Sequence, residues 1–191
     1  QLGVRAEQAE TIIDTGDVIK NTYNSIFPSG HIQFAFSKRQ EIQLSFSKRV
    51  NRPNDWHINP FKRRHSPTFE RHGNPYLKPE YIDSWDLSYS AYGQMVSVYV
   101  KDVTDLIRHY RFDSDSGLTV LTFRNMGDAQ QSGIEFVSRF KPFPFWSFMA
   151  SVNAFQTKIY SFSEDVDNES ELNPETKGVR GRISSTISLP S

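Results

Sequence analysis

The chain has 191 residues, with 22 Lys and Arg against 22 Asp and Glu, no cysteine and an aromatic content of 14%. The net charge of +0 gives no electrostatic case for a nucleic-acid partner, and the lack of cysteine excludes disulfides, thiolate metal sites and a cysteine nucleophile. The sequence has no run of about 18 or more apolar residues that could form a membrane helix, but a spanning β-strand needs only about 9–11 residues, apolar at every second position.

Alternation of apolar and polar residues predicts a series of strands. In chain order these are 2–7, 23–37, 41–50, 81–91, 94–112, 118–140, 148–154 and 179–187. In the clearest, Ile42, Leu44 and Phe46 alternate with polar residues, so that the two kinds of side chain lie on opposite faces. Segment 118–140 allows either two short strands or one long strand bent at its glycines. The sequence therefore predicts an all-β fold, an antiparallel up-and-down meander of about eight strands.

The predicted connections differ in length. Short connections are expected near 38–40, 92–93 and 141–145, long polar loops near 10–22, 51–79 and 161–175, and a moderate turn at 113–117. In a meander, alternate connections lie at the same edge of the sheet, so the long loops gather at one rim. Long outward loops and short inward turns are typical of membrane barrels. The pattern predicts a section of a large transmembrane β-barrel, with a soluble all-β binding or adhesion module as the alternative.

Aromatic residues crowd the short turn near residue 144. Phe143, Phe145 and Trp146 would suit an aromatic girdle at a membrane interface. They would equally suit the open end of a soluble core, so this feature does not separate the two folds.

Several motifs occur in a fixed order over about residues 1–160. They are 3–7 (GVRAE), 27–29 (FPS), 45–53 (SFSKRVNRP), 58–61 (INPF), 73–80 (GNPYLKPE), 101–107 (KDVTDLI), 125–127 (NMG) and 132–135 (SGIE). Together they resemble the barrel of TonB-dependent outer-membrane receptors, in the version called the outer membrane protein beta-barrel family. The pair SKRVNRP and GNPYLKPE is the most specific part of this resemblance.

The resemblance implies a barrel of about 22 strands in the bacterial cell outer membrane, closed by a plug domain. Such receptors import a scarce nutrient, such as a metal chelate, a vitamin or an oligosaccharide. The implied partners are the lipid bilayer with lipopolysaccharide, a small nutrient ligand, the plug and an inner-membrane energy-transducing complex. The implied protein is a transporter, not an enzyme, and no catalytic residue, cofactor or metal is predicted. A porin-like structural barrel is a further alternative.

Residues 1–191 are expected to form one partial barrel domain. The sequence shows no plug, no energy-coupling peptide and no final strand with a terminal aromatic residue. A middle-to-late section of a larger barrel is therefore expected.

The long outward loop 51–79 carries the candidate ligand contacts. These are Trp56, His57, Lys62, Arg63, Arg64, His65 and His72. The basic run 62–65 could pair with lipopolysaccharide phosphates or with an anionic ligand, although a solvated run of charges is the simpler interpretation. The spacing of the histidines matches no compact metal-binding motif, which favours solvated side chains over metal ligands.

The same loop has features that favour a structural role. Its prolines at 53, 60, 75 and 79 limit backbone freedom and so lower the entropy lost on ordering. Trp56, Phe61, Phe69 and Tyr76 are expected to pack the loop into a lid over the lumen. Ligand specificity is then expected at other loop positions.

Two further chemistries receive little support. Residues 165–171 are rich in oxygen ligands for Ca²⁺ but lack the glycine and the spacing of an EF-hand loop. Ser, His and Asp are all present, yet the sequence contains no nucleophile elbow and no HExxH motif.

Overall fold

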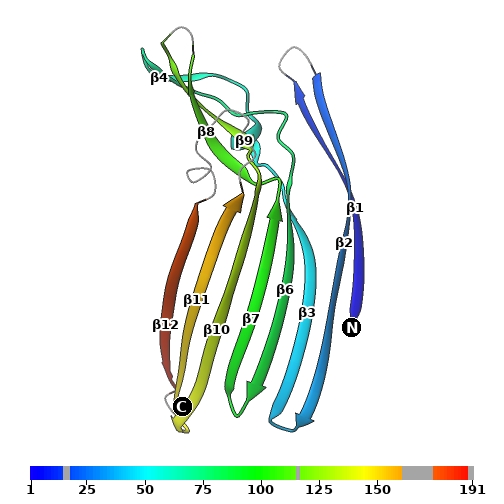
Figure 1. The fold of residues 1–191 in the computed structure, drawn as a ribbon, viewed down its shortest axis with the longest axis vertical. Coiled ribbons are helices and arrows are strands. Elements are labelled where there is room, and N and C mark those ends of the chain that lie inside the picture. The colour runs from blue at the N-terminus through cyan, green and yellow to red at the C-terminus, as the bar shows by residue number, and fades with distance from the viewer. Residues whose placement is uncertain (15–17, 115–116, 161–173, 189–191) are drawn as a thin grey trace.

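The computed structural model describes residues 1–14, 18–114, 117–160 and 174–188, which form two sheets and one short helix (Figure 1). The main sheet has eight strands: β1 (Leu2–Asp14), β2 (Val18–Ser37), β3 (Gln40–Asn51), β6 (Glu80–Ala91), β7 (Gln94–Thr104), β10 (Asp128–Phe143), β11 (Trp146–Tyr160) and β12 (Glu175–Ile187). The outer sheet has β4 (Arg63–Ser66), β5 (Phe69–Arg71), β9 (Thr119–Asn125) and β8 (Ile107–Asp113), and the helix is α1 (Asp55–Ile58).

The main sheet is a meander. Its strands lie in the order β1-β2-β3-β6-β7-β10-β11-β12, and each neighbouring pair is antiparallel. The sheet is curved and open, with β1 and β12 at its two edges (Figure 1). The predicted all-β meander of about eight strands is confirmed.

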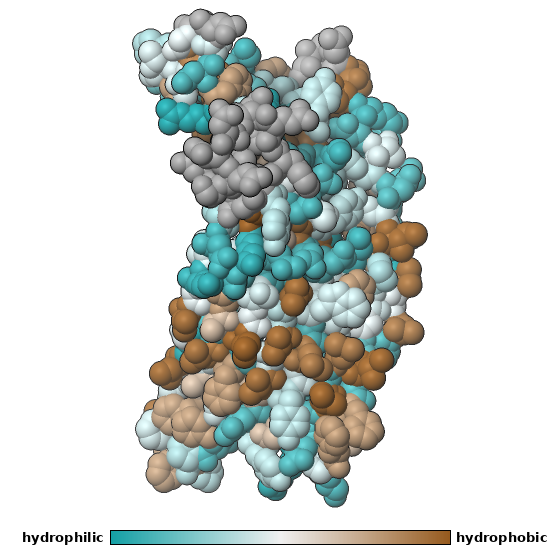
Figure 2. Space-filling model, in the orientation of Figure 1, coloured by the Kyte–Doolittle hydropathy of each residue, from teal (hydrophilic) through white to brown (hydrophobic). Residues whose placement is uncertain are grey.

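One face of the main sheet is apolar in continuous rows. The strand registers align Ile32, Leu44, Leu87, Val98, Ile134, Ala154 and Val179 in one row. The next row on this face holds Phe34, Ile42, Tyr89, Val96, Phe136, Val152 and Gly181. Figure 2 shows a brown band across the lower half of the molecule, left uncovered by the described elements. Side chains such as Ile32, 70% exposed, would face water in a soluble module but face lipid in a barrel.

The opposite face of the same strands is polar. Between the apolar rows lies a row of Gln33, Gln43, Ser88, Ser97, Glu135, Asn153 and Arg180. Successive residues of a strand point to opposite faces, so this row faces away from the apolar band. An apolar outside and a polar inside are the two faces of a membrane barrel.

A charged row limits the apolar band on the side of the long connections. It consists of Lys48, Asp83, Asp102, Gln130, Lys158 and Glu175. Lys48 Nζ lies 3.4 Å from Asp83 Oδ2, and Gln130 Nε2 donates to Asp102 Oδ1 at 2.8 Å. A band of hydrophilic residues lies above the brown band in Figure 2.

Aromatic rings gather at the other end of the sheet, by the short turn between β10 and β11. The Phe143 ring stacks on Phe145 and Trp146 at 5.6 and 6.3 Å between centroids, and Trp146 lies 4.5 Å from Phe148. An interfacial girdle occupies this position, beyond the apolar rows, in membrane barrels.

From β2 onward long and short connections alternate as predicted, but the outer segments are more regular than predicted. The expected polar loop at 10–22 is wrong, because β1 continues to Asp14 and β2 begins at Val18. Outside a membrane a hairpin needs no apolar face, so its sequence shows no alternation. Cross-strand pairing maintains it, with Lys20 Nζ 2.9 Å from Glu10 Oε2. The predicted loop at 161–175 lies almost wholly outside the described residues.

The expected single strand 94–112 is also wrong. Strand β7 ends at Thr104 and β8 begins at Ile107, with Asp105 between them at φ 56°. Of the two alternatives for segment 118–140, the structure shows two strands, β9 and β10, separated at Gly127 with φ 91°. The Leu106 amide donates to the Gly127 carbonyl at 2.9 Å, and this junction turns the chain out of the main sheet.

The connection from β3 to β6 was expected to lack secondary structure, which is wrong: it contains α1, β4 and β5. Strand β5 pairs in parallel with β9, which joins this connection to the β8–β9 hairpin. Among the described residues no helix has the length and apolar character to cross a membrane.

Candidate functional site

The outer rim consists of the β3–β6 connection (52–79), the β8–β9 hairpin and the outer ends of β1 and β2, all at one end of the molecule (Figure 1). Its first element is α1. The Asn54 side chain caps this helix, with Oδ1 accepting from the His57 amide at 3.0 Å. This cap places Trp56 and His57 on a fixed turn directly after the SKRVNRP motif.

The GNPYLKPE motif docks on α1 through its glycine. The Gly73 amide donates to the Asn59 carbonyl at 2.6 Å, and the Asn74 amide donates to the His57 carbonyl at 2.7 Å. A Cβ atom on residue 73 would lie only 2.5 Å from the His57 carbonyl oxygen. Only glycine allows two backbone segments to approach so closely.

The same motif then runs along β9. The Asn74 side chain donates to the Phe123 carbonyl at 3.0 Å. Asn125 Oδ1 accepts from the Lys78 amide at 2.9 Å, while its Nδ2 donates to the carbonyls of Lys78 and Asp105 at 3.0 and 2.6 Å. One asparagine side chain therefore clamps the GNPYLKPE segment to the β7–β8 junction.

The motif also fills the gap between β2 and β3. These strands pair only from Ser29 and Ser47 onward to the short turn, so the outer half of β2 has no β3 partner. Asn21 Nδ2 donates to the Pro75 carbonyl at 2.8 Å and the Tyr23 hydroxyl to the Leu77 carbonyl at 3.0 Å. Hydrogen bonds from alternate side chains of β2 to the GNPYLKPE backbone thus take the place of the missing backbone hydrogen bonds between β2 and β3.

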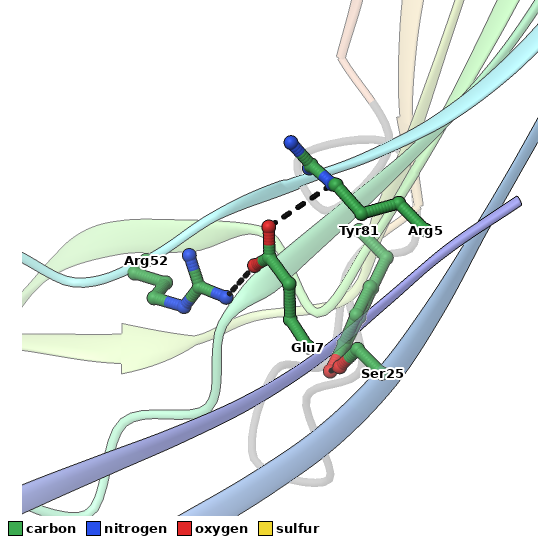
Figure 3. A network of polar contacts seen from close by, with 5 residues as sticks. All are labelled: Arg5, Glu7, Ser25, Arg52 and Tyr81. Atoms are coloured by element: carbon green, nitrogen blue, oxygen red, sulfur yellow. Dashed lines mark hydrogen bonds and ion pairs between the residues drawn. The ribbon is translucent and has the colours of Figure 1, made fainter.

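Figure 3 shows the polar contacts where the connection leaves and re-enters the main sheet. Glu7 on β1 accepts from Arg52 Nη2 at 2.5 Å and from Arg5 Nε at 3.0 Å. The hydroxyls of Ser25 on β2 and Tyr81 on β6 lie 2.8 Å apart. Both ends of the β3–β6 connection are therefore tied to the β1–β2 hairpin.

A small core lies inside the rim. Leu77 is 1% exposed and Phe123 is 3% exposed. The buried Glu80 carboxylate accepts from Asn51 Nδ2 and from the Ile107 amide, both at 2.6 Å, so it joins β3, β6 and β8. The predicted packing of aromatic residues is wrong here, because Phe61 and Tyr76 are 64% and 72% exposed. The proline- and leucine-containing motif fills the core instead.

His57 belongs to this core rather than to the solvent. Its ring lies 4.6 Å from the Phe123 ring, and His109 lies against the same phenylalanine at 4.6 Å. Its Nδ1 is buried without a hydrogen-bond partner. Burial lowers the pKa of His57, the Glu80 carboxylate opposes this shift, and His109 adds to it. Burial and the neighbouring His109 thus both favour the neutral form of the ring.

The tip of the connection, β4 and β5, presents the other predicted residues. Lys62 Nζ and Arg64 Nε lie 3.4 and 3.7 Å from the carboxylate of the buried Glu70. His65 is exposed against Phe69, with the rings 5.9 Å apart.

Trp56, Arg63 and His72 come together in one place. They line a small hollow with Asn59, Phe61, Arg71 and Gly73. Arg71 lies over the Trp56 ring at 4.2 Å from the centroid and Arg63 at 5.3 Å. Sequence reasoning missed Arg71, which stands apart from the basic run 62–65. The register of β4 and β5 brings it opposite Arg63.

Metal chemistry has no ready site in this region. Within the residues that the structure describes, no group of at least three His, Asp or Glu side chains is placed to hold a metal ion. His57, His65 and His72 have separate neighbours: Phe123, Phe69 and the Gly73 carbonyl. The possible calcium ligands at 165–171 lie outside the described residues.

The profile of the outer membrane protein beta-barrel family matches residues 1–191. The chain belongs to this family. The resemblance found in its motifs is thereby confirmed, and the family places this barrel section in the bacterial outer membrane. No curated protein matches the sequence.

Solved structures similar to this outer-membrane barrel chain include transport receptors. The siderophore receptor PirA from Pseudomonas aeruginosa shares 12% identity at a TM-score of 0.59, over 98% of this chain and 40% of its own. The copper transporter OprC shares 15% identity at a TM-score of 0.53, over 96% of this chain and 36% of the OprC chain. A mutant of the ferric enterobactin receptor PfeA from Pseudomonas aeruginosa shares 13% identity at a TM-score of 0.53, over 90% of this chain and 34% of the PfeA chain.

These likenesses concern the fold. The barrel chain spans 40% or less of the length of each of these structures. Its curved open sheet corresponds to part of their barrels, and its relatives in fold are transport receptors rather than enzymes.

Proposed function

We propose that this chain is a section of the barrel of a TonB-dependent receptor that imports a scarce nutrient. The ligand would be a metal chelate, a vitamin or an oligosaccharide, captured by outward segments and passed inward through a plug-gated lumen. Residues 1–191 would form one partial barrel domain, and the plug, the energy-transducing complex and lipopolysaccharide would be its partners in the whole protein.

One observation carries this proposal: the outer rim is a folded unit. The β3–β6 connection is held by Asn125 from one side and by Tyr23 from the other. A structural barrel needs no such unit, whereas capture of a ligand is favoured when the residues that contact it are already held in place. The polar inner face of the main sheet suits a lumen through which a hydrophilic nutrient passes.

The test uses a bacterium that carries the full-length gene and a deletion strain. Growth is measured with a ferric siderophore, cobalamin or an oligosaccharide as the limiting nutrient, with and without a protonophore. We expect the deletion to abolish energy-dependent uptake of one of these nutrients and the intact gene to restore it. A general loss of permeability to small solutes, unaffected by the protonophore, would contradict the proposal and identify a porin-like barrel.

A further inference from the structure

Two arginines face each other across the hairpin of β4 and β5. The register of these strands places Arg63 directly opposite Arg71. Like charges in this position destabilise an antiparallel pair. Segment 62–71 contains four cationic side chains and a single carboxylate, that of Glu70. The hairpin therefore carries more positive charge than is best for its own stability.

The nearby carboxylate does not compensate the two arginines. Glu70 is paired with Lys62 and Arg64 instead. Among the described residues, the guanidinium groups of Arg63 and Arg71 take part in no ion pair and donate no hydrogen bond. Both lie over the Trp56 ring, at 5.3 and 4.2 Å from its centroid. A guanidinium that packs against an aromatic ring keeps its five in-plane N–H donors available.

The surroundings of this pair are fixed in place. Trp56 stands on the capped helix α1, and Arg71 precedes His72, whose amide donates to the Leu121 carbonyl at 3.2 Å. The two arginines, Trp56 and His72 line one small hollow of about 10 Å³, room for about one water molecule. The hollow is too small to enclose a chelate, so a small charged group would bind at its mouth, against the two guanidinium groups.

We propose that Arg63, Arg71 and Trp56 form a binding site for an oxyanion, a phosphate or a carboxylate group with at least two free oxygen atoms. Such a group accepts charge-assisted hydrogen bonds from both guanidinium edges and removes the repulsion between them. The Trp56 ring offers an apolar surface to whatever carries the group. Lys62 and Arg64, already paired with Glu70, stay outside the site.

The oxyanion has two possible sources. It belongs either to the imported nutrient, in which case the inference rests on the proposed function, or to a lipopolysaccharide phosphate beside the receptor. The chemistry at the two arginines is the same in both cases.

The first experiment measures anion binding to the full-length protein in detergent free of lipopolysaccharide. Inorganic phosphate, pyrophosphate and citrate are titrated by calorimetry, with glycerol as the uncharged control. We expect Arg63→Gln and Arg71→Gln each to weaken binding of at least one anion by about tenfold or more. Arg64→Gln removes the same charge from the same strand and is expected to change binding less than about threefold.

The same variants give a second measurement, the thermal unfolding of the anion-free protein. Without anion, Arg63→Gln and Arg71→Gln should leave the melting temperature unchanged or raise it, because they remove repulsion between like charges. Affinities equal to that of the unchanged protein in both variants would overturn the inference. So would a matched loss in Arg64→Gln, which would indicate a diffuse effect of charge.

The second experiment separates the two sources and the two proposals. Uptake of the limiting nutrient and binding to vesicles with phosphorylated or dephosphorylated lipopolysaccharide are compared for the unchanged protein and Arg71→Gln. Reduced uptake in Arg71→Gln assigns the site to the nutrient, whereas reduced binding to phosphorylated vesicles alone assigns it to lipopolysaccharide. If deletion of the gene affects no uptake, the proposed function fails, but the anion titrations still decide the site. If Arg71→Gln alters neither uptake nor vesicle binding, the site has no physiological oxyanion and the inference fails.

Discussion

Gly73 shows how strongly a single residue can constrain the outer rim. Its missing side chain allows the backbone of GNPYLKPE to lie directly against the end of α1. A methyl group there would approach the Asn59 nitrogen and oxygen to 2.7 Å, and these are backbone atoms that cannot rotate away.

Gly73→Ala should therefore loosen the rim while leaving the main sheet folded. We expect a local loss of about 1–3 kcal/mol, the usual effect of forcing a methyl group into a packed site. Hydrogen exchange of the Gly73 and Asn74 amides in the full-length protein measures it. Gly181→Ala is the matched control, since its nearest atom would be the Ser151 carbonyl oxygen at 3.8 Å. Equal exchange in the two variants would contradict this explanation.

His57 should make the rim sensitive to acid. Because burial lowers the pKa of His57 in the folded protein, the unfolded rim binds a proton more readily. The rim should be most stable above the ordinary histidine pKa of about 6.5 and lose stability as the pH falls below it. A proton on the buried, unpartnered Nδ1 would have no acceptor.

Hydrogen exchange of residues 55–61, corrected for the intrinsic rate, checks this at pH 7.5 and 5.5, values chosen to bracket about 6.5. His57→Gln should flatten the pH dependence, and His65→Gln, an exposed site, should preserve it. A pH dependence that survives His57→Gln would assign the effect to a group other than His57.

At the scale of elements, the rim is held by side chains that reach from one connection to another. Asn125, at the end of β9, contacts three backbone groups in two other segments. Tyr23 contacts the same motif from β2. The rim therefore depends on a few polar residues more than on a large apolar core.

Asn125→Ala should release the GNPYLKPE segment. It removes three hydrogen bonds to the backbone groups of Lys78 and Asp105, of which only the one to Asp105 is partly buried, so we expect a loss of about 0.5–1.5 kcal/mol per bond. The rate of chymotrypsin cleavage after the exposed Tyr76 is expected to rise, while the main sheet resists. Asn24→Ala, an exposed asparagine on β2, should cleave at the unchanged rate. If the Asn125→Ala protein is cleaved no faster than the unchanged protein, the contacts of Tyr23 and Gly73 are sufficient to hold the GNPYLKPE segment.

The elements that sequence alone predicted well are those that face lipid. Strands 41–50 and 81–91 were placed within a residue or two of β3 and β6, because one side of each had to be apolar. The outer strands have no such requirement: β8 falls within the predicted single strand 94–112, and the sequence leaves 118–140 open between one bent strand and two short ones. Arg71 lies opposite Arg63 because of the pairing register of β4 and β5, and the spacing of the residues in the sequence does not predict this register. Phe123 and Asn125 reach the site from a different connection, a contact between segments far apart in sequence.

At the scale of the whole molecule, the rows of the main sheet set its position in the membrane. Leu87 lies between Leu44 and Val98 in a row that is apolar on each of the seven strands it crosses, from β2 to β12. A charge there would face hydrocarbon, whereas a charge on the neighbouring polar row would face the lumen.

Leu87→Arg should therefore destabilise the full-length protein by about 2–4 kcal/mol if this row lies near the bilayer midplane. Denaturant titration in lipid vesicles, followed by gel mobility without heating, measures the folded fraction. Gln43→Arg, on the polar face between Gln33 and Ser88, should have little effect. A tolerated Leu87→Arg would mean that the apolar face is covered by protein rather than by lipid.

The parallel pairing of β5 with β9 has a mechanical consequence. It joins the β3–β6 and β7–β10 connections into one body, so neither can swing while the other stays still. The two connections meet the main sheet at four places, Asn51, Glu80, Asp105 and Gly127, and the last two residues have positive φ angles. Any opening of the entrance would be a tilt of this whole body about those four places. A force applied at the tip of one connection would then displace both connections where they join the main sheet.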